Sequence, residues 1–339
     1  MGKFISNIVE YAKIERIVFK YFCLLKRIDI LSCFVVNYYL DGMIHMILMV
    51  SGRTDIVGFY SKWFMNRYRE GYVCVRNPFN PKLVSKINFD NVDLILFCTK
   101  NPRPIIPYLK EIKQPILFHV TLTPYKKDIE PNVKNKKEII EDIKTISKII
   151  GSDNIYVRYD PVLLNNNYTV AYHKKAFNHL CESLNGYVKH IIISFIDIYK
   201  NVKNNSAYLS LHDFTSDDYK AIGMSFSASA KANGMTVQTC FEEKNLTEYG
   251  FIKADCIGAT LAYKLTGNIY KKQNIRKGKK CACVETVDIG VYNTCLHHCK
   301  YCYANYDESK IDNLVKKHNP NSPLLIGELS YDDIIKERR

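Results

Sequence analysis

The sequence has no uncharged apolar run long enough to cross a lipid bilayer. The longest such run, Ile30–Leu40, falls well short of the roughly 20 residues that a membrane-spanning helix needs. It also has no clear signal-peptide cleavage pattern near the N-terminus. These absences predict a cytoplasmic protein with no membrane partner.

Acidic residues are fewer than basic ones: 34 Asp and Glu stand against 48 Lys and Arg, which gives a net charge of +14. Such an excess is typical of a protein that binds a polyanion, for example a nucleic acid. It is also what a lysine-rich composition produces without any polyanion. The lysines are scattered, with denser runs only at 134–137 and 271–280, so both interpretations stay open.

A secreted disulfide scaffold is not expected, because the chain is much longer than such scaffolds. Its twelve cysteines are nevertheless many for an intracellular enzyme, and seven of them lie between Cys240 and Cys302. Cys295, Cys299 and Cys302 stand in C-x3-C-x2-C spacing. Clustering of this kind predicts metal ligation in a reducing compartment.

Three kinds of metal centre fit these three cysteines. Three thiolates on a four-iron cluster leave one iron without a protein ligand, open to a substrate or cofactor. A closed Fe–S cluster would take a fourth cysteine from elsewhere, and a structural zinc ion would take His297 or His298. The spacing, with the aromatic Tyr301 just before the third cysteine, favours the open cluster.

From Met46 onward, short apolar runs alternate with longer amphipathic stretches. The expected strands are Met46–Val50, Val92–Cys98, Pro115–Val120, Ile155–Arg158, His190–Ser194, Met235–Thr239 and Val284–Ile289. The expected helices are Phe59–Arg69, Lys136–Ile150, Val170–Leu184 and Asp217–Asn233. Thr215 and Asp218 form a capping box, and Gly151 and Gly234 stand at helix C-caps.

Apolar strands that alternate with helices predict an α/β fold with a buried parallel sheet. We expect a TIM-like (β/α) barrel, complete or partial, with a C-terminal Cys-rich loop that binds a cluster. The barrel would span 46–329, including the Cys-rich segment 240–305, and a tail would follow at 330–339. Residues 1–45 are either an added helical extension or the product of a start codon placed too early.

Polar residues follow the expected strands at 51–55, 99–102, 121–125, 158–161, 194–197 and 240–243. In a parallel barrel these strand ends meet on the face where active sites lie. Many such residues are explained as helix N-caps or ordinary loop residues. Charges that directly abut a strand end, as Lys100 and Arg158 do, are not explained in this way. With Asp160, they are the catalytic candidates.

The cysteine segment, Asn293 followed by C-x-H-x-C-x-Y-C-Y-A, resembles the cluster loop of the radical S-adenosylmethionine (SAM) enzymes. Among these it is most similar to the spore photoproduct lyase-like branch. His298 stands where a glycine is usual, and one residue fewer separates Asn293 from the first cysteine. Neither difference removes a ligand.

Residues 46–329 as a whole resemble the DUF1848 family. The matching strings are Val-Ser-x-Arg-Thr-Asp-Ile (50–56), Arg-Asn-Pro-Phe-Asn-Pro (76–81), Thr-Lys-Asn-Pro (99–102), Leu-Thr-Pro-Tyr-x-x-Asp-Ile-Glu-Pro (122–131), Arg-Tyr-Asp-Pro (158–161) and the cysteine loop. Gly52 stands where the family usually has a second Arg, which weakens any role for that position.

The cysteine loop follows the first strand in ordinary radical SAM enzymes, whereas here it comes last. Moving residues 284–305 to the front would restore the order of motifs in the lyase-like branch. Those motifs are here Thr54–Asp55, Thr99–Lys100, Glu130–Pro131 and Asp160–Val162. The resemblance therefore implies a circularly permuted barrel in which the cysteine loop lies beside the 51–55 end.

The resemblance also implies an activity. A [4Fe–4S] cluster on the three cysteines would bind SAM and, with one electron from a donor, cleave it to a 5′-deoxyadenosyl radical that abstracts hydrogen from a substrate. The expected cofactor contacts are Thr54, Asp55, Thr123 and Tyr301. The substrate is unknown, and the lyase-like resemblance and the positive charge admit a nucleotide or nucleic acid.

Four further cysteines, Cys240, Cys256, Cys281 and Cys283, would hold a second centre, either an auxiliary Fe–S cluster or zinc. Burial as apolar thiols is the alternative. Two other functions stay open: a nucleic-acid-binding protein stabilised by zinc or Fe–S, and a redox sensor with closed clusters. The polar strand ends argue against both, because neither needs a large concave face.

Overall fold

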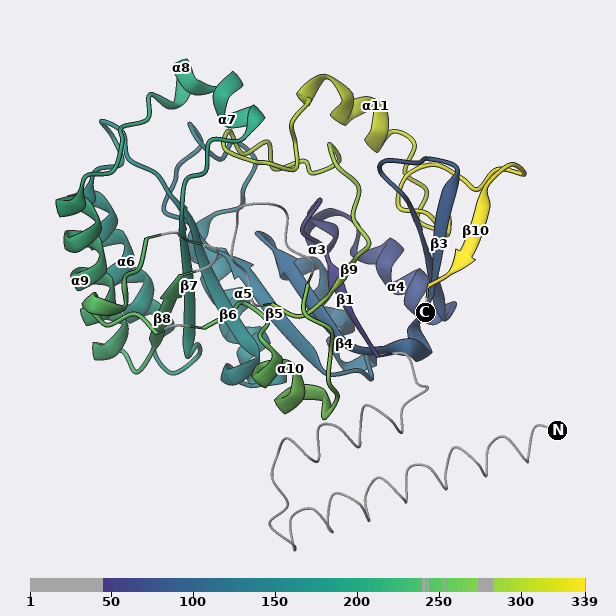
Figure 1. Cartoon of the computed structure of the whole chain (residues 1–339), viewed down its shortest axis with the longest axis horizontal. Coiled ribbons are helices and arrows are strands. Elements are labelled where there is room, and N and C mark those ends of the chain that lie inside the picture. The colour runs from purple at the N-terminus through teal and green to yellow at the C-terminus, as the bar shows by residue number, and fades with distance from the viewer. Residues whose placement is uncertain (1–44, 240–241, 243, 253, 274–282, 339) are drawn as a thin grey trace, which may run out of the picture. The chain divides into compact units, whose positions relative to one another are not determined.

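The computed structural model describes residues 45–338 except 240–241, 243, 253 and 274–282. Its main sheet has seven strands in the order β8-β7-β6-β5-β4-β1-β9, and all neighbouring strands are parallel (Figure 1). The strands are β1 (Met46–Val50), β4 (Val92–Thr99), β5 (Ile116–Thr121), β6 (Ile155–Val162), β7 (His190–Phe195), β8 (Thr236–Thr239) and β9 (Val287–Asp288). The expected α/β fold and its seven strands are confirmed, with bounds shifted by a few residues.

The strand order departs from chain order at one place only. β9 pairs with β1, with Leu48 opposite Val287 and Met49 opposite Asp288. From β1 to β8 the remaining strands of this sheet follow one another in chain order. The last strand of the sheet therefore occupies the place of a strand that would precede β1.

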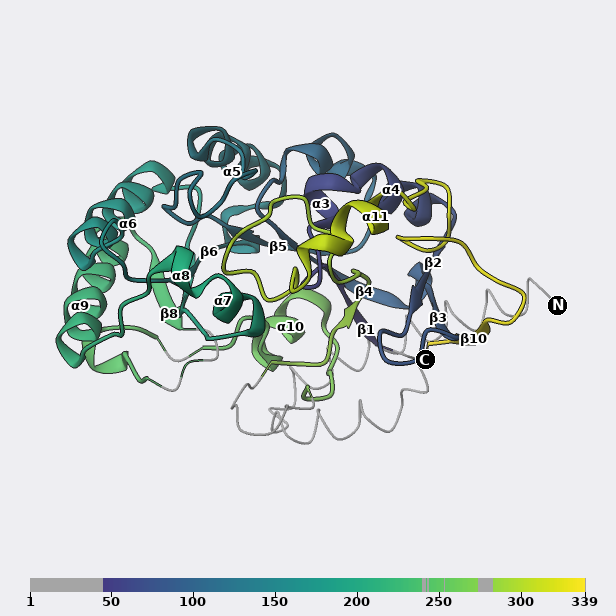
Figure 2. The same ribbon diagram turned by 90° about the horizontal axis from the view of Figure 1, so that it is seen from above.

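Helices cover both faces of the sheet (Figure 2). Those along one face are α3 (Ile56–Phe59), α4 (Ser61–Arg69), α5 (Lys136–Ile150), α6 (Val170–Leu184) and α9 (Ser216–Ala232). On the other face lies α10 (Ala259–Thr266). The expected bounds of α5 and α6 are confirmed, and the helix expected at 59–69 is instead divided into α3 and α4 at Tyr60.

The helix ends follow the expected local chemistry. Thr215 Oγ1 accepts a hydrogen bond from the Asp218 amide, and the Asp218 carboxylate accepts one from the Thr215 amide, which completes the capping box of α9. Gly151 caps α5 with φ +88°, and Gly234 follows α9 with φ +67°. Only glycine adopts these left-handed angles without a steric cost.

The sheet face beneath α10 is apolar. Its buried side chains are Ile47, Leu94, Leu96, Leu117, Tyr156 and Ile192 from the sheet, packed against Cys256, Ile257, Ala262, Cys283 and Val284. We call this cluster the apolar floor. It holds the segment on either side of α10 against the sheet.

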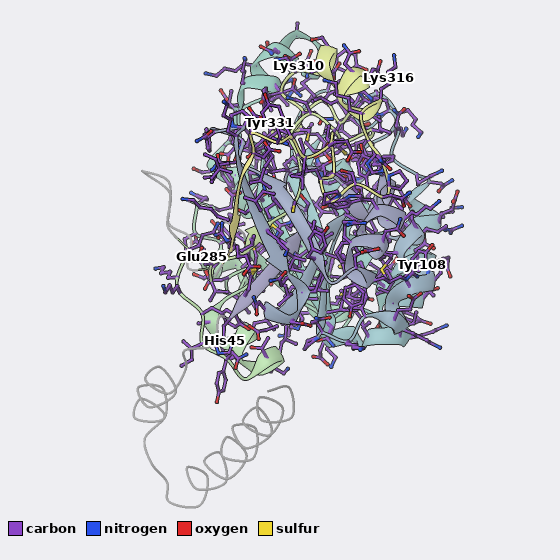
Figure 3. The ribbon with its side chains drawn as sticks, turned by 90° about the vertical axis from the view of Figure 1, so that its right-hand side faces the viewer. His45, Tyr108, Glu285, Lys310, Lys316 and Tyr331 are labelled. Atoms are coloured by element: carbon purple, nitrogen blue, oxygen red, sulfur yellow. The ribbon has the colours of Figure 1, made fainter. Side chains whose placement is uncertain are left out.

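A second, smaller sheet was not predicted. It consists of β2 (Tyr72–Arg76), β3 (Leu83–Asn88) and β10 (Ile334–Glu337) in the order β10-β3-β2. The segment 330–339, expected only as a tail, thus contributes a strand that pairs in parallel with β3. Tyr331 is fully exposed just before that strand (Figure 3).

The remaining elements are short. They are α7 (Lys200–Asn204), α8 (Ser206–Leu209), α11 (Ile311–Val315) and the 3-10 helices η1 (Phe89–Asn91), η2 (Arg103–Glu111), η3 (Ser152–Asn154), η4 (Thr247–Tyr249) and η5 (Glu308–Lys310). Of the helices in the described part of the chain, none combines the length and the apolar character needed to cross a membrane.

Candidate functional site

Cys295, Cys299 and Cys302 lie in the loop that follows β9, at the carboxyl-terminal edge of the sheet. Cys295 and Cys299 are buried, and Cys302 is partly exposed. Burial raises the pKa of all three thiols, and Cys302 raises the pKa of the other two further.

The backbone of the cysteine loop turns at two left-handed residues, Asn293 (φ 58°) and His298 (φ 55°). A residue with a Cβ adopts this conformation only at a steric cost, which glycine would avoid at both positions. Asn293 Oδ1 accepts a hydrogen bond from the Asp307 amide at 2.9 Å, and Asn305 Nδ2 donates to the Cys295 carbonyl at 2.6 Å. Side chains of the same segment thus hold the loop in shape.

Asp288, at the end of β9, fastens this segment to the end of β1. Its carboxylate accepts hydrogen bonds from Ser51 Oγ at 2.7 Å and from the Gly52 amide at 2.8 Å. Gly290 is needed at this contact, because a Cβ there would lie 1.9 Å from Ser51 Oγ. The cysteine loop therefore begins beside residues 51–55, which is the place that a permuted order requires.

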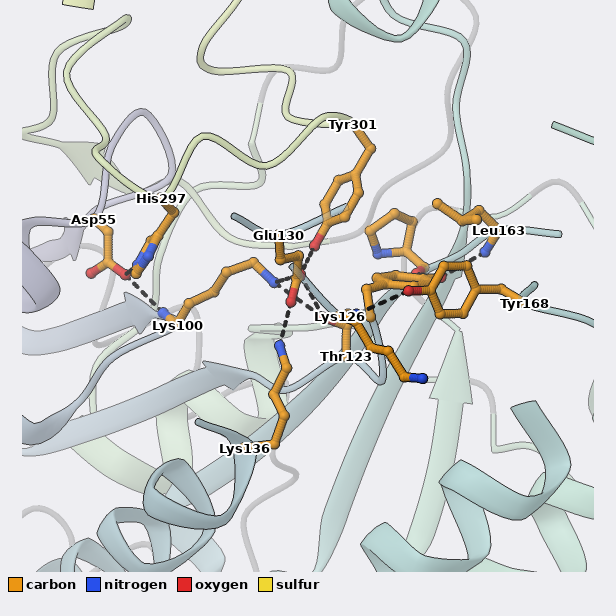
Figure 4. Close-up of polar contacts among 12 residues, drawn as sticks. Asp55, Lys100, Thr123, Lys126, Glu130, Lys136, Leu163, Tyr168, His297 and Tyr301 are labelled. Atoms are coloured by element: carbon orange, nitrogen blue, oxygen red, sulfur yellow. Dashed lines mark hydrogen bonds and ion pairs between the residues drawn. The ribbon is translucent and has the colours of Figure 1, made fainter. Parts of the chain in front are cut away.

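Asp55 joins the end of β1 to the middle of the cysteine loop (Figure 4). Its Oδ2 lies 2.8 Å from His297 Nε2 and 2.8 Å from the Lys100 amide, and its Oδ1 accepts from the Gly58 amide at 2.7 Å. Burial alone would raise the pKa of Asp55, but the hydrogen bond and charge of His297 hold it below its usual value. An ionised carboxylate only accepts, so Nε2 of His297 carries a proton.

The second ring nitrogen of His297 has no hydrogen-bond partner within the described residues, although the side chain is only 2% exposed. Buried polar atoms nearly always have a partner. A histidine that donates one N–H to a carboxylate and leaves its other nitrogen unoccupied is the arrangement found at metal centres. Because His297 lies between Cys295 and Cys299, its Nδ1 fits contact with a group that the polypeptide itself does not supply.

Glu130 is the second buried carboxylate of the site (Figure 4). It accepts hydrogen bonds from Lys100 Nζ at 2.7 Å and Thr123 Oγ1 at 2.6 Å, and also from Lys136 Nζ and the Tyr301 hydroxyl. Burial would raise its pKa, but the two ammonium groups lower it to about 2. One carboxylate thus connects β4, the segment after β5, the start of α5 and the cysteine loop.

Opposing effects act on the Cys299 thiol. Burial raises its pKa most strongly and Glu130 and Cys302 raise it further, whereas Lys100 and Lys136 lower it, and the net shift is upward. The two lysines are the groups that would stabilise the thiolate, which is the form that binds metals.

Arg158 and Asp160 form a separate pair near the carboxyl end of β6. Arg158 Nε donates to Asp160 Oδ2 at 3.1 Å and Nη2 donates to the same oxygen at 2.5 Å. The Ser194 hydroxyl also donates to Asp160, and Arg158 Nη1 lies 3.4 Å from Cys256 Sγ. Burial would raise the pKa of Asp160, but the charge of Arg158 lowers it.

The predicted site residues thus fall into two groups. Asp55, Lys100, Thr123 and Tyr301 belong to one network around the cysteine loop, and Arg158 pairs with Asp160 beside it. Thr54 is buried, and its Oγ1 has no partner within the described residues.

The four cysteines proposed for a second centre are placed only in part. Cys256 and Cys283 both lie in the apolar floor, and Cys283 forms an antiparallel bridge with Gly258. Cys240 and Cys281 lie outside the described residues.

Among the residues that the structure describes, no three His, Cys, Asp or Glu side chains are arranged to hold a single metal ion. Zinc would require all its ligands within roughly 2.0–2.3 Å of one atom. A four-iron cluster instead binds each thiolate at a different iron, so its ligands need not meet at one point.

Sequence reasoning missed Glu130, Lys136 and Asp288 as members of the site. Glu130 stood within a family-like string, and Asp288 stood inside an expected strand, but neither position carried a chemical pattern of its own. Lys136 appeared as the first residue of a helix and as part of the lysine run 134–137. Their importance arises from contacts between segments that are distant in sequence.

The model of a family described as a domain of unknown function, DUF1848, matches residues 47–304. This range runs from β1 to the end of the cysteine loop and contains Asp55, Glu130, Asp288 and the three cysteines. The comparison with curated proteins gave no match. Because the match covers most of the chain, the chain belongs to the DUF1848 family.

Proposed function

We propose that the chain is a radical SAM-type enzyme in which Cys295, Cys299 and Cys302 hold a [4Fe–4S] cluster. The observation that carries the proposal is the place of the three thiols. They share one short loop at the carboxyl-terminal edge of a parallel sheet, where α/β enzymes bind their ligands.

The topology supports a partial TIM-like barrel that has been circularly permuted. Read from β9 to β8, the parallel strands form one continuous series, as they would if β9 preceded β1 in the chain. Permutation changes the connection between elements and leaves their contacts intact. The bonds from Asp288 to Ser51 and from Asp55 to His297 join the cysteine segment to the end of β1, as contacts that survive a permutation would.

The residues present fit such a cluster. When bound, it would leave one iron for SAM, and one electron from an external donor would split SAM into methionine and a 5′-deoxyadenosyl radical that takes a hydrogen atom from the substrate. Lys100 and Lys136 would offset the negative charge of the thiolates. Asp55 would fix His297 so that its unpartnered Nδ1 remains inside the loop.

The contacts revise the expected roles. Asp55, Thr123 and Tyr301 use their polar atoms on protein partners, so we assign them to positioning the loop rather than to binding SAM. Thr54 keeps an unpartnered hydroxyl within the described residues and remains the candidate for a cofactor contact. Arg158 and Asp160, each partly accessible, would face the substrate.

The proposal is tested on anaerobically purified protein by iron and zinc analysis and by EPR of the reduced state with and without SAM. We expect roughly four iron atoms per chain, an EPR signal that shifts with SAM, and release of 5′-deoxyadenosine. About eight iron atoms would indicate that the set Cys240, Cys256, Cys281 and Cys283 holds a second cluster. One zinc ion in addition would place zinc in that set.

Cys295→Ser should abolish both the shift and the product. Cys181→Ser is the matched control, because Cys181 is buried in α6 away from the loop. Zinc alone at the loop, or an iron signal that does not respond to SAM, would refute the proposal. The first result favours a zinc-stabilised binding protein and the second a closed-cluster redox protein.

A further inference from the structure

A row of exposed tyrosines and lysines begins next to Cys302. Its members lie in α7 and α8, at positions next to α7, and in the segment that follows β5. Its members, which we call the tyrosine–lysine strip, are Tyr303, Tyr199, Lys200, Lys203, Tyr208 and Lys126.

Direct contacts link the segments that carry the strip. The rings of Tyr303 and Tyr199 lie 5.7 Å apart between centroids. Asn201, on α7, donates from Nδ2 to the Cys302 carbonyl at 3.2 Å, so this helix rests on the cysteine loop. The Tyr208 hydroxyl donates to the Asp128 carbonyl at 2.7 Å, which joins α8 to the segment of Lys126.

The tyrosines are held by their hydroxyl groups, while their rings remain accessible. The Tyr199 hydroxyl donates to Asp197 at 2.9 Å, and the Tyr303 hydroxyl donates to the Gly52 carbonyl. The two residues are nevertheless 42% and 49% exposed, and Tyr208 is 57% exposed. Rings that are oriented in this way and partly exposed are suited to stacking against a planar group.

The lysines of the strip add positive charge. Lys126, Lys200 and Lys203 are exposed, and in the described part of the chain none of them forms an ion pair with a carboxylate. Asp128 and Asp197 lie beside the strip, and each accepts a hydrogen bond from a tyrosine hydroxyl, Asp128 from that of Tyr168. The three lysines outnumber these two carboxylates, so the strip is basic by a small excess, in a chain whose net charge is +14.

We propose that the tyrosine–lysine strip binds a single-stranded nucleic acid. The bases of the nucleic acid stack on the tyrosines, and its phosphates contact the lysines. Proteins hold single strands in this way without sequence preference. Base pairs in a duplex do not expose their faces, so a duplex binds less well. A strand on the strip reaches the cysteine loop at Tyr303, and the substrate class of the proposed enzyme is then a nucleotide unit within that strand. Only this last step rests on the proposed function.

The test is fluorescence anisotropy with a labelled dodecamer of thymidine, without SAM, over a series of salt concentrations. Tyr199→Ala should weaken binding about 5- to 150-fold, the range produced by loss of one stacked base. Lys200→Glu with Lys203→Glu should reduce the slope of log affinity against log salt by about 1.4, which corresponds to two phosphate contacts on a single strand. Lys174→Glu with Lys175→Glu, on the exposed side of α6, is the charge-matched control and should leave the slope unchanged.

The proposal is overturned if the duplex binds as tightly as the single strand or if Tyr199→Ala binds like the unmodified protein. It is also overturned if the α6 variant loses as much affinity as the α7 variant, because binding then follows net charge alone. Equal binding of polyglutamate, unaffected by Tyr199→Ala, would indicate an acidic protein partner instead. If the unmodified protein cleaves SAM but does not bind the oligonucleotide, only the proposal for the strip is refuted. If it binds the oligonucleotide but does not cleave SAM, only the proposed enzyme activity is refuted.

Discussion

The apolar floor and the charged edge of the same sheet are built in opposite ways. The floor buries side chains such as Leu117 and Ile192 with no polar partner to satisfy. The charged edge, which we define as Asp55, Lys100, Glu130, Lys136 and Asp288, instead gathers ionised groups around the cysteine loop.

The apolar floor adds to the stability of the fold, whereas the charged edge carries a cost in stability. Each fully buried Leu or Ile contributes about 1.5–3 kcal/mol through burial. A buried charge network must first offset the desolvation of its ions, and an apolar replacement is often as stable. The charged edge is therefore explained by what it positions, while the floor is explained by stability alone.

Removing the central carboxylate of the charged edge should have the largest effect. Glu130→Gln leaves the buried ammonium groups of Lys100 and Lys136 without an anion, so the free energy of unfolding should fall by about 3–5 kcal/mol. Urea unfolding measures the change. Glu138→Gln, an exposed position on the same helix α5, is the control and should change stability by less than about 0.5 kcal/mol. Equal effects of the two variants would remove the case for a charged network.

Truncating the floor should destabilise the protein without affecting the cluster. Leu117→Ala on β5 creates a cavity under α10 and should lower the free energy of unfolding by about 2–5 kcal/mol. At low temperature the iron content of Leu117→Ala should equal that of the unmodified protein, whereas the iron content of Glu130→Gln should be lower. Ile335→Ala, at a half-exposed position on β10, is the control for side-chain loss. A parallel loss of iron in Leu117→Ala would mean that the two regions are not separable.

The floor was predictable from local pattern, because buried parallel strands contain continuous apolar runs such as Leu94–Cys98. The same holds for α5 and α6, whose apolar residues recur at helical spacing and whose caps are local. The small sheet was not predictable. β10 pairs with β3 across most of the chain length, and its exposed residues carry no periodic signal.

Of the charged edge and the cysteine loop that it surrounds, only the residues that form a short motif in the sequence could be predicted. The spacing of Cys295, Cys299 and Cys302 lies within one loop, so it was visible in the sequence. Glu130 acquires its role from four segments that meet in space, and no short pattern records such a meeting. Lys100 and Tyr301 were identified, but their shared partner was not.

Low pH should destabilise the protein through a different buried polar group, His173, which is neutral rather than charged in the folded state. His173 on α6 donates from Nε2 to the Leu163 carbonyl, because a carbonyl only accepts, and its Nδ1 receives the Tyr159 hydroxyl. Burial lowers the pKa of His173 to about 4, below the usual value near 6.5. The unfolded chain therefore binds the proton more readily, and stability falls as pH drops from about 6.5 to 4, by about 3 kcal/mol.

His173→Gln should flatten that part of the stability curve, measured by urea unfolding at each pH. His179→Gln, at an exposed position on the same helix, should leave the curve unchanged. Some slope remains in the variant, because burial also lowers the pKa of His119, to about 3. Glu130, with its pKa near 2, loses its contribution only below about pH 4.5, so most of the loss due to His173 precedes that due to Glu130 as the pH falls. An unchanged curve in His173→Gln would contradict the assignment.

The smallest expected effect separates two tyrosines that flank Cys302. Tyr301→Phe removes one donor from Glu130 but keeps the buried ring, so stability should fall by about 1.5 kcal/mol, the usual contribution of a hydrogen bond to a charged group. Tyr303→Phe removes a bond from a half-exposed hydroxyl to the Gly52 carbonyl and should cost less than about 1 kcal/mol. Thermal unfolding compares the two variants. If they prove equal, Tyr301 contributes through packing alone, and the link from the charged edge to the cysteine loop runs through Asp55 and His297.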